Sequence, residues 1–174
     1  MLSAILESHI AIANWISSGV VLYICTPFVF FITSNNSQHL LWGTSVVVAP
    51  MVAEGIKRIS CVVGITKYYK WANRPVGACD CDTWNRNGPR GGTPGFPSGH
   101  SAVAAAFWVG AVLLYKDWRT MLMGYAGILV MVWARLNKRC HTLFQTMGGT
   151  VLGAGVATGV LGWYRNSLWP FHGV

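Results

Sequence analysis

The chain has 174 residues and a formal net charge of +8, with 53% hydrophobic and only 10% charged residues. Soluble domains carry about 25% charged residues, so this composition excludes a disordered tail, a coiled coil and most soluble enzymes. The length suits one domain, residues 1–174, in which about five membrane spans of roughly 20 residues would fit.

The apolar segments predict five membrane-spanning helices in chain order. They are expected at residues 10–33, 40–65, 98–115, 120–134 and 142–163. Pro27 can kink the first helix, and the first fifteen residues either extend that helix or lie along the membrane interface. In the last helix, Gly149 and Gly153, and likewise Gly155 and Gly159, have the four-residue spacing that lets helices approach closely in lipid.

The second predicted span carries three charges, Glu54, Lys57 and Arg58, in its later half. Charges at that depth are costly unless they are paired or face an aqueous cavity. Glu54 and Arg58 are four residues apart and meet on one helix face. We interpret them as a structural ion pair in preference to a part of a functional site.

Positive charge alone can indicate nucleic acid, but here the cations lie mainly between apolar segments, so no nucleic-acid partner is expected. Five cysteines are too few for a disulfide scaffold. Cys79 and Cys81 lack a matching pair at zinc-site spacing, so no metal and no cofactor is predicted. The first apolar segment lacks a basic leader and runs long, which favours a retained span over a cleaved signal peptide.

Residues 66–97 break the apolar pattern with repeated proline and glycine, which is typical of a long functional loop. Because each span reverses the side of the membrane, the loop and the polar junction 134–145 are expected on the same side. Three separated polar clusters therefore converge there.

These clusters contain the residue types that phosphoryl transfer requires. The first runs from Lys67 to Arg74-Pro75, the second is Pro97-Ser98-Gly99-His100, and the third runs from Arg135 through His141 to Gln145. Lysine and arginine neutralise phosphate oxygens, and the free N–H groups at a helix N-terminus bind anions. Two histidines supply a nucleophile and a general acid near neutral pH.

The three clusters resemble the type 2 phosphatidic acid phosphatase superfamily, whose pattern is K-x6-RP, PSGH and SR-x5-H-x3-D. The resemblance implies an all-α, multi-pass membrane bundle of about five to six helices. It implies that His141 attacks phosphorus to form a phosphohistidine and that His100 protonates the leaving oxygen and later activates water. It further implies that a group of five residues holds the phosphoryl oxygens without a metal: Lys67, Arg74, Ser98, Gly99 and Arg135.

Two positions depart from that pattern. Ala134 replaces the serine before the arginine, which removes at most one phosphate hydrogen bond. Gln145 replaces the aspartate that orients the nucleophilic histidine; its carbonyl oxygen can accept the same bond but carries no charge. His141 is then expected to be a weaker nucleophile, unless Asp80 or Asp82 in the loop substitutes.

The resulting prediction is a membrane phosphatase that hydrolyses a lipid phosphomonoester or diphosphate, with the lipid bilayer and its phosphate lipids as partners. The main alternative is a catalytically impaired relative that binds phospholipid headgroups. A vanadate-dependent haloperoxidase and a purely structural membrane protein are two further alternatives. An extracytoplasmic site is weakly favoured, because relatives commonly have one; the oligomeric state is left open.

Overall fold

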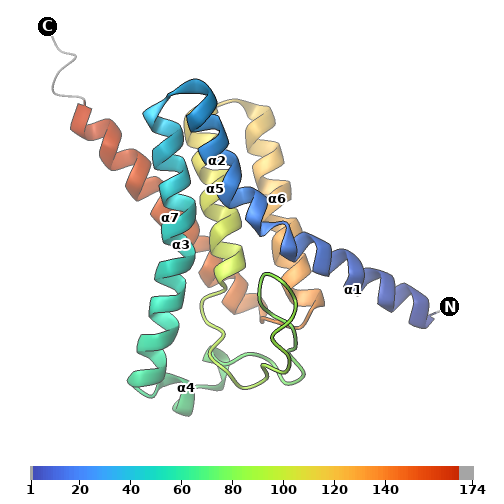
Figure 1. Cartoon of the computed structure of the whole chain (residues 1–174). Coiled ribbons are helices and arrows are strands. Elements are labelled where there is room, and N and C mark those ends of the chain that lie inside the picture. Colours follow the sequence, from blue (N-terminus) through green and yellow to red (C-terminus); the bar gives the residue numbers. More distant parts are fainter. Residues whose placement is uncertain (1, 169–174) are drawn as a thin grey trace, which may run out of the picture.

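The computed structural model describes the backbone of residues 2–168 and the side chains of residues 7–163. Six helices of fifteen residues or more make up this part of the chain (Figure 1). They are α1 (Leu2–Ser18), α2 (Val20–Ser34), α3 (Ser37–Val62), α5 (Gly99–Tyr115), α6 (Trp118–Asn137) and α7 (Leu143–Leu168). The short α4 (Ile65–Tyr68) and a 3-10 turn at Lys70–Ala72 open the long loop. The all-α prediction is confirmed.

Three of these segments are long and apolar enough to cross a membrane, which is consistent with an integral membrane protein. They are Glu7–Ser34, Ser37–Val62 and Trp118–Asn137. Three of the five predicted spans are therefore long and apolar enough. The third predicted span, which is α5, is apolar but only 17 residues long. Over its described residues, α7 is also not among the segments that qualify, since its glycines and threonines lower the mean hydropathy.

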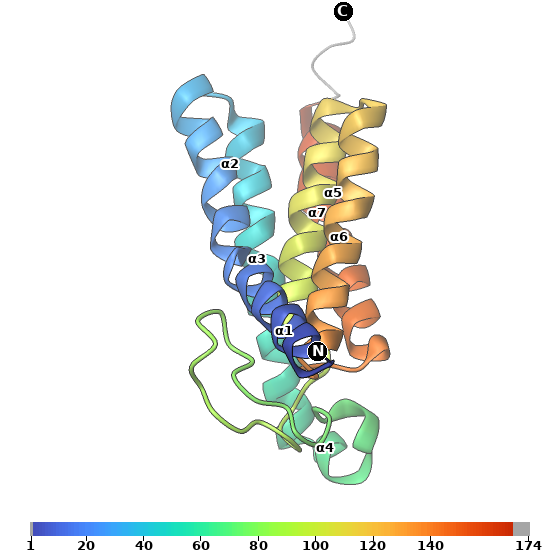
Figure 2. The ribbon, with the colours of Figure 1, turned by 90° about the vertical axis from the view of Figure 1, so that its right-hand side faces the viewer.

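The first predicted span is broken at Gly19 rather than at Pro27. Pro27 is buried inside α2, whereas α1, before the break, runs obliquely to α2 and packs on α6 (Figures 1 and 2). The apolar side chains of Ile12 and Trp15 on α1 are exposed. An oblique helix with exposed apolar groups is typical of a segment at a membrane interface, which favours the second of the two expectations for the first fifteen residues.

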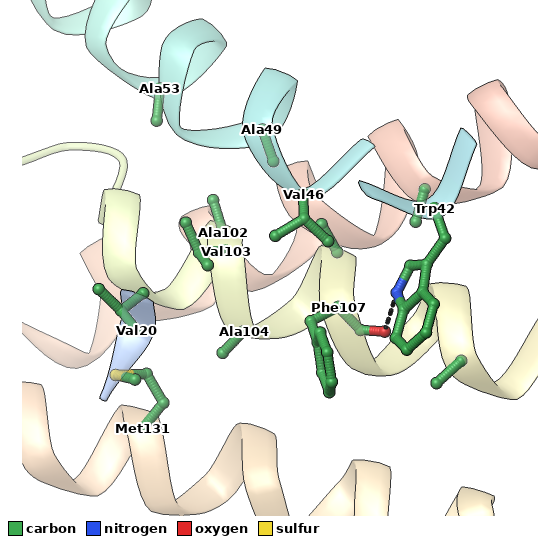
Figure 3. Packing of buried hydrophobic residues seen from close by; sticks show 13 residues of the cluster. Val20, Trp42, Val46, Ala49, Ala53, Ala102, Val103, Ala104, Phe107 and Met131 are labelled. Carbon is green, nitrogen blue, oxygen red and sulfur yellow. Dashed lines mark hydrogen bonds between the residues drawn. The ribbon is translucent and has the colours of Figure 1, made fainter. Parts of the chain in front are cut away.

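Helix α5 lies at the centre of the bundle and contacts α3, α6 and α7. Four alanines of α5 are fully buried, at positions 102, 104, 105 and 106, and small side chains let the neighbouring helices approach. Within the same core, the indole nitrogen of Trp42 donates a hydrogen bond to the backbone oxygen of Phe107 at 2.8 Å (Figure 3). The bond pairs the only polar atom of a buried indole.

The closest helix contact is between α5 and α7. A Cβ atom at Gly149 would lie 2.2 Å from Ser98 O, and one at Gly153 would lie 2.1 Å from Ala102 O. Gly155 and Gly159 have nothing within 4 Å of such an atom. Only the first of the two glycine pairs therefore acts as a packing surface. It holds the N-terminal ends of α5 and α7 side by side, at the end of the bundle that carries the long loop.

We expect Gly153→Ala to destabilise the protein by about 1–3 kcal/mol, because the added methyl group must displace the α5 backbone. Gly155→Ala is the matched control: it faces open space, so it should be neutral or slightly stabilising. Thermal unfolding of the two variants in detergent measures the difference. Equal unfolding temperatures would contradict the close α5–α7 contact.

Candidate active site

A cavity of about 460 Å³ opens at the loop end of the bundle, a size typical of small-molecule sites. The loop 69–98 and the α6–α7 connection both lie at this end in Figures 1 and 2, as the argument from alternating spans predicts. Its walls come from α3, the loop, the start of α5 and the α6–α7 junction. They are formed by Glu54, Lys57, Arg58, Cys61, Arg74, Cys81, Asp82, Thr83, Asn87, Arg90, Thr93, Pro94, Gly99, His100 and His141.

Four of the sequence-predicted site residues line this cavity together: Arg74, Gly99, His100 and His141. They come from three segments that are far apart in the sequence. The guanidinium of Arg74 joins two of the segments, because Nη1 lies 3.0 Å from Cys140 O and 3.1 Å from His141 Nε2. The loop and the junction are thus in direct contact.

The hydrogen bonds of His141 assign its tautomer. Arg74 has only donors, so His141 Nε2 must be the acceptor and carries a lone pair. His141 Nδ1 then carries the proton and donates to Gln145 Oε1 at 3.2 Å. The nitrogen with the lone pair is the one beside the Arg74 guanidinium, an arrangement that suits a nucleophile.

Gln145 is fully buried, and its amide serves two segments at once. Its Nε2 donates to Trp71 O at 2.9 Å and to Asn73 O at 2.7 Å. Because both partners are carbonyl acceptors, the amide nitrogen must face the loop and Oε1 must face His141. A carboxylate cannot donate to those two carbonyls. A glutamine in place of the family's aspartate at position 145 can therefore hold the start of the loop through Trp71 O and Asn73 O.

Burial lowers the pKa of His141 well below its ordinary value, and the charges of Arg74 and Arg135 lower it further. The imidazole is therefore neutral near pH 7, the form that can attack phosphorus. Burial, followed by the charge of Arg90, lowers the pKa of Arg74 to about 10. That value still leaves the guanidinium charged at neutral pH.

His100 stands at the start of α5, and its Nε2 is buried with no hydrogen-bond partner among the described residues. Unpaired buried nitrogens are rare, and one beside a cavity is available to a ligand oxygen. Ser98 is the N-cap of α5, since its Oγ accepts a hydrogen bond from Ser101 N at 3.4 Å. Ser98 N donates to Gln145 O at 3.0 Å, which ties the two histidine-bearing helix ends together.

Three predicted phosphate ligands do not line the cavity. Lys67 is exposed, with its ammonium 5.8 Å from the ring centre of Tyr68. Ser98 is fully buried beneath the start of α5. Arg135 is also fully buried and donates to Ser17 Oγ at 3.1 Å and to Cys81 O at 2.7 Å.

Lys57 lines the cavity where Lys67 does not. Its side chain is only 12% exposed, and its ammonium lies 3.9 Å from the position of a Cβ atom on Gly99. The expected pair of Glu54 and Arg58 exists at 3.8 Å, but Glu54 also binds Lys57 at 3.3 Å and all three line the cavity. The expected ion pair is therefore present, and it lies at the wall of the cavity. A cation inside a predicted span is costly unless it is paired or faces a cavity, and this was the feature of the sequence that could have indicated Lys57 as a site residue.

A disulfide between Cys81 and Cys140 links the middle of the loop to the residue before His141. The backbone oxygens of these two cysteines accept hydrogen bonds from Arg135 and Arg74, respectively. Cys79 is free and exposed. The bridge joins residues 59 positions apart, so sequence spacing gave no sign of it. It fixes the loop against the junction beside the nucleophile.

No three His, Cys, Asp or Glu side chains that the structure describes lie close enough together to hold a metal ion. The cavity is lined by cations, two histidines, the N-terminal end of α5 and the carboxylates of Glu54 and Asp82. Cations, imidazoles and a helix N-terminus are the groups that suit an anion and phosphoryl transfer.

The sequence model that describes the PAP2 superfamily matches residues 42–169, nearly three quarters of the chain. The chain belongs to the PAP2 superfamily, a family with phosphatase-type activity on phosphoric esters. No curated protein and no solved structure matches it.

Replacing both Cys81 and Cys140 by serine should lower the free energy of unfolding by about 2–4 kcal/mol, because the bridge closes a long loop. Thermal unfolding in detergent checks this, with Cys25→Ser, an exposed free cysteine, as the control. A double variant as stable as the wild type would show that the bridge contributes nothing.

Proposed function

We propose that the protein is a membrane phosphatase that hydrolyses a lipid phosphomonoester or diphosphate through a phosphohistidine on His141. The observation that carries this proposal is the hydrogen-bonded series from Gln145 through His141 to Arg74, beside a cavity lined by His100. It holds a neutral imidazole with its lone pair next to a cation that binds phosphate.

In the first step, His141 Nε2 attacks phosphorus while the bond from phosphorus to the leaving oxygen breaks. Arg74 leaves the Nε2 lone pair and binds the phosphoryl oxygens, together with Lys57 and the N–H group of Gly99. His100 enters this step as the imidazolium, donates the Nε2 proton to the leaving oxygen and becomes neutral. The positive charge that develops on His141 is not balanced by a carboxylate, because Gln145 is neutral.

In the second step, His100 accepts a proton from water as that water attacks the phosphohistidine. The bond between phosphorus and Nε2 breaks, and orthophosphate leaves. Such transfers depend mostly on positioning and on charge stabilisation. Cations supply that stabilisation here, so the proposal requires no metal. Arg135 acts from behind the cavity wall, through its charge and through Cys81 O.

A lipid substrate is favoured because the cavity lies at the ends of apolar helices. A lipid can then present its phosphate to the cavity while its tail stays in the bilayer. The disulfide supports an extracytoplasmic site, since disulfides persist in oxidising compartments. The exposed apolar side chains of Ile12 and Trp15 give α1 a surface suited to the same interface.

The second candidate function is that of a headgroup-binding relative with little turnover. The neutral Gln145 favours it, since losing the orienting carboxylate of a serine-protease triad costs about 10⁴ in rate. That cost arises partly from the wrong tautomer, and here the amide assigns the useful tautomer of His141. We therefore rank turnover above binding alone.

The test is phosphate release by the purified chain from farnesyl phosphate, farnesyl diphosphate and phosphatidic acid in detergent, without added metal. We expect release by the wild type and a loss of at least about 10³-fold in His141→Gln. Acid-labile phosphate on the wild-type protein would identify the intermediate. Wild type that binds vanadate but releases no phosphate would replace this proposal by the binding function.

A paired comparison tests which lysine binds phosphate. Lys57→Met should lower kcat/KM by about 10–100-fold, because it removes a charge-assisted hydrogen bond to the phosphoryl group. Lys67→Met should change it by less than about threefold, since that side chain is exposed outside the cavity. Far-UV circular dichroism of both variants controls for folding. A larger loss of kcat/KM in Lys67→Met than in Lys57→Met would assign phosphate binding to Lys67, as the sequence pattern predicts.

A further inference from the structure

The cavity contains a pair of arginines that the proposed mechanism does not use as a pair. Arg74 and Arg90 both line it, and the charge of Arg90 is the largest charge effect on the pKa of Arg74. Two like charges repel each other when no anion lies between them. Some feature of the fold must therefore hold Arg74 and Arg90 at the same cavity.

The cause is a turn that binds the backbone of both arginines. Arg74 N donates to Thr93 O at 2.7 Å, and Gly92 N donates to Arg74 O at 3.2 Å. Arg90 O accepts from Thr93 N at 3.1 Å and from Thr93 Oγ1 at 2.7 Å. Arg90 N donates to Ala78 O at 2.7 Å. The loop thus holds the backbone of Arg90 on both sides and keeps it next to the loop segment that carries Arg74.

The guanidinium of Arg90 has no carboxylate partner among the side chains that the structure describes. The carboxylate of Glu54 is engaged with Lys57 and Arg58. The carboxylate of Asp82 accepts a hydrogen bond from Arg86 N at 2.9 Å. Arg90 is exposed at the cavity wall, and only its backbone is held by the contacts above. A guanidinium without a carboxylate partner at the wall of a cavity is suited to an anion from outside the protein.

We propose that Arg90 is a specificity-determining residue that binds a second phosphate group of the substrate. This inference rests on the proposed function and narrows it. The terminal phosphoryl group lies at His141 and Arg74, and the second phosphate group lies between Arg74 and Arg90. When the terminal bond breaks, the electron pair goes to the leaving oxygen of a lipid monophosphate, whose negative charge Arg90 stabilises. The exposed Arg58, held only at 3.8 Å by Glu54, is available on the α3 side of the same cavity.

Two kinds of lipid carry this chemistry: a diphosphate, with directly linked groups, and a headgroup with two phosphates separated by a short linker. The experiment compares kcat/KM for farnesyl diphosphate, farnesyl phosphate and phosphatidylglycerophosphate. Arg90→Gln is the test variant. Arg86→Gln is the matched control, because Arg86 is an exposed arginine of the same loop that does not line the cavity.

We expect the wild type to prefer farnesyl diphosphate over farnesyl phosphate by about tenfold or more. Arg90→Gln should lower kcat/KM for the diphosphate by about 10–100-fold and leave the monophosphate within about threefold. Arg86→Gln should leave both unchanged. A loss confined to phosphatidylglycerophosphate would assign the site to separated phosphates. Equal losses for all substrates, or no loss for any, would overturn the proposal.

A binding measurement separates this inference from the proposed function. Calorimetric titration with methylenediphosphonate and with methylphosphonate needs no turnover. Tighter binding of the diphosphonate, abolished in Arg90→Gln, would support the second phosphate site even if no substrate is hydrolysed. Equal binding of the two compounds by the wild type would overturn it even if the protein is an active phosphatase.

Discussion

The side-chain amide of Gln145 is the contact on which the arrangement of the site depends. Its oxygen accepts from His141 Nδ1, and its nitrogen donates to the backbone oxygens of Trp71 and Asn73. One buried group thereby sets the tautomer of the histidine and the position of the loop that brings Arg74 to it. A carboxylate would perform the first task better and the second not at all. The glutamine is therefore a part of this loop's attachment, not simply a lost acid.

The contact between α5 and α7 gives the amide a fixed frame. Without side chains at Gly149 and Gly153, α7 approaches the α5 backbone directly, and Ser98 N binds the backbone oxygen of Gln145. His100 lies in the first turn of α5, and His141 lies two residues before α7 begins. The N-terminal ends of the two helices are consequently held together by backbone contacts. Backbone contacts are insensitive to side-chain motion, which suits a pair of groups that must act on opposite sides of one phosphorus atom.

The sequence predicted the helices and the meeting of Arg74, His100 and His141, because those inferences depend on local apolar length and on motif spacing near helix ends. It did not predict that Lys57 lines the cavity and that Lys67 lies exposed outside it, because spacing before Arg74 does not reveal the short helical turns of this segment. It also could not reveal the disulfide or the two loop carbonyls at Gln145. Both involve partners about 60 to 70 residues apart, which only the folded chain brings together.

The charge balance of this region follows from the same contacts. Arg135 is fully buried without a carboxylate, and polar oxygens of Ser17 and Cys81 take its place as acceptors. Burying an unpaired cation is unfavourable in a protein that binds nothing, since its desolvation is not recovered. An anion in the adjacent cavity would recover part of that cost, which supports the proposed phosphate substrate. The helices and the loop tolerate this repulsion because the disulfide, the Gln145 amide and the α5–α7 contact hold the cations in place before any anion arrives.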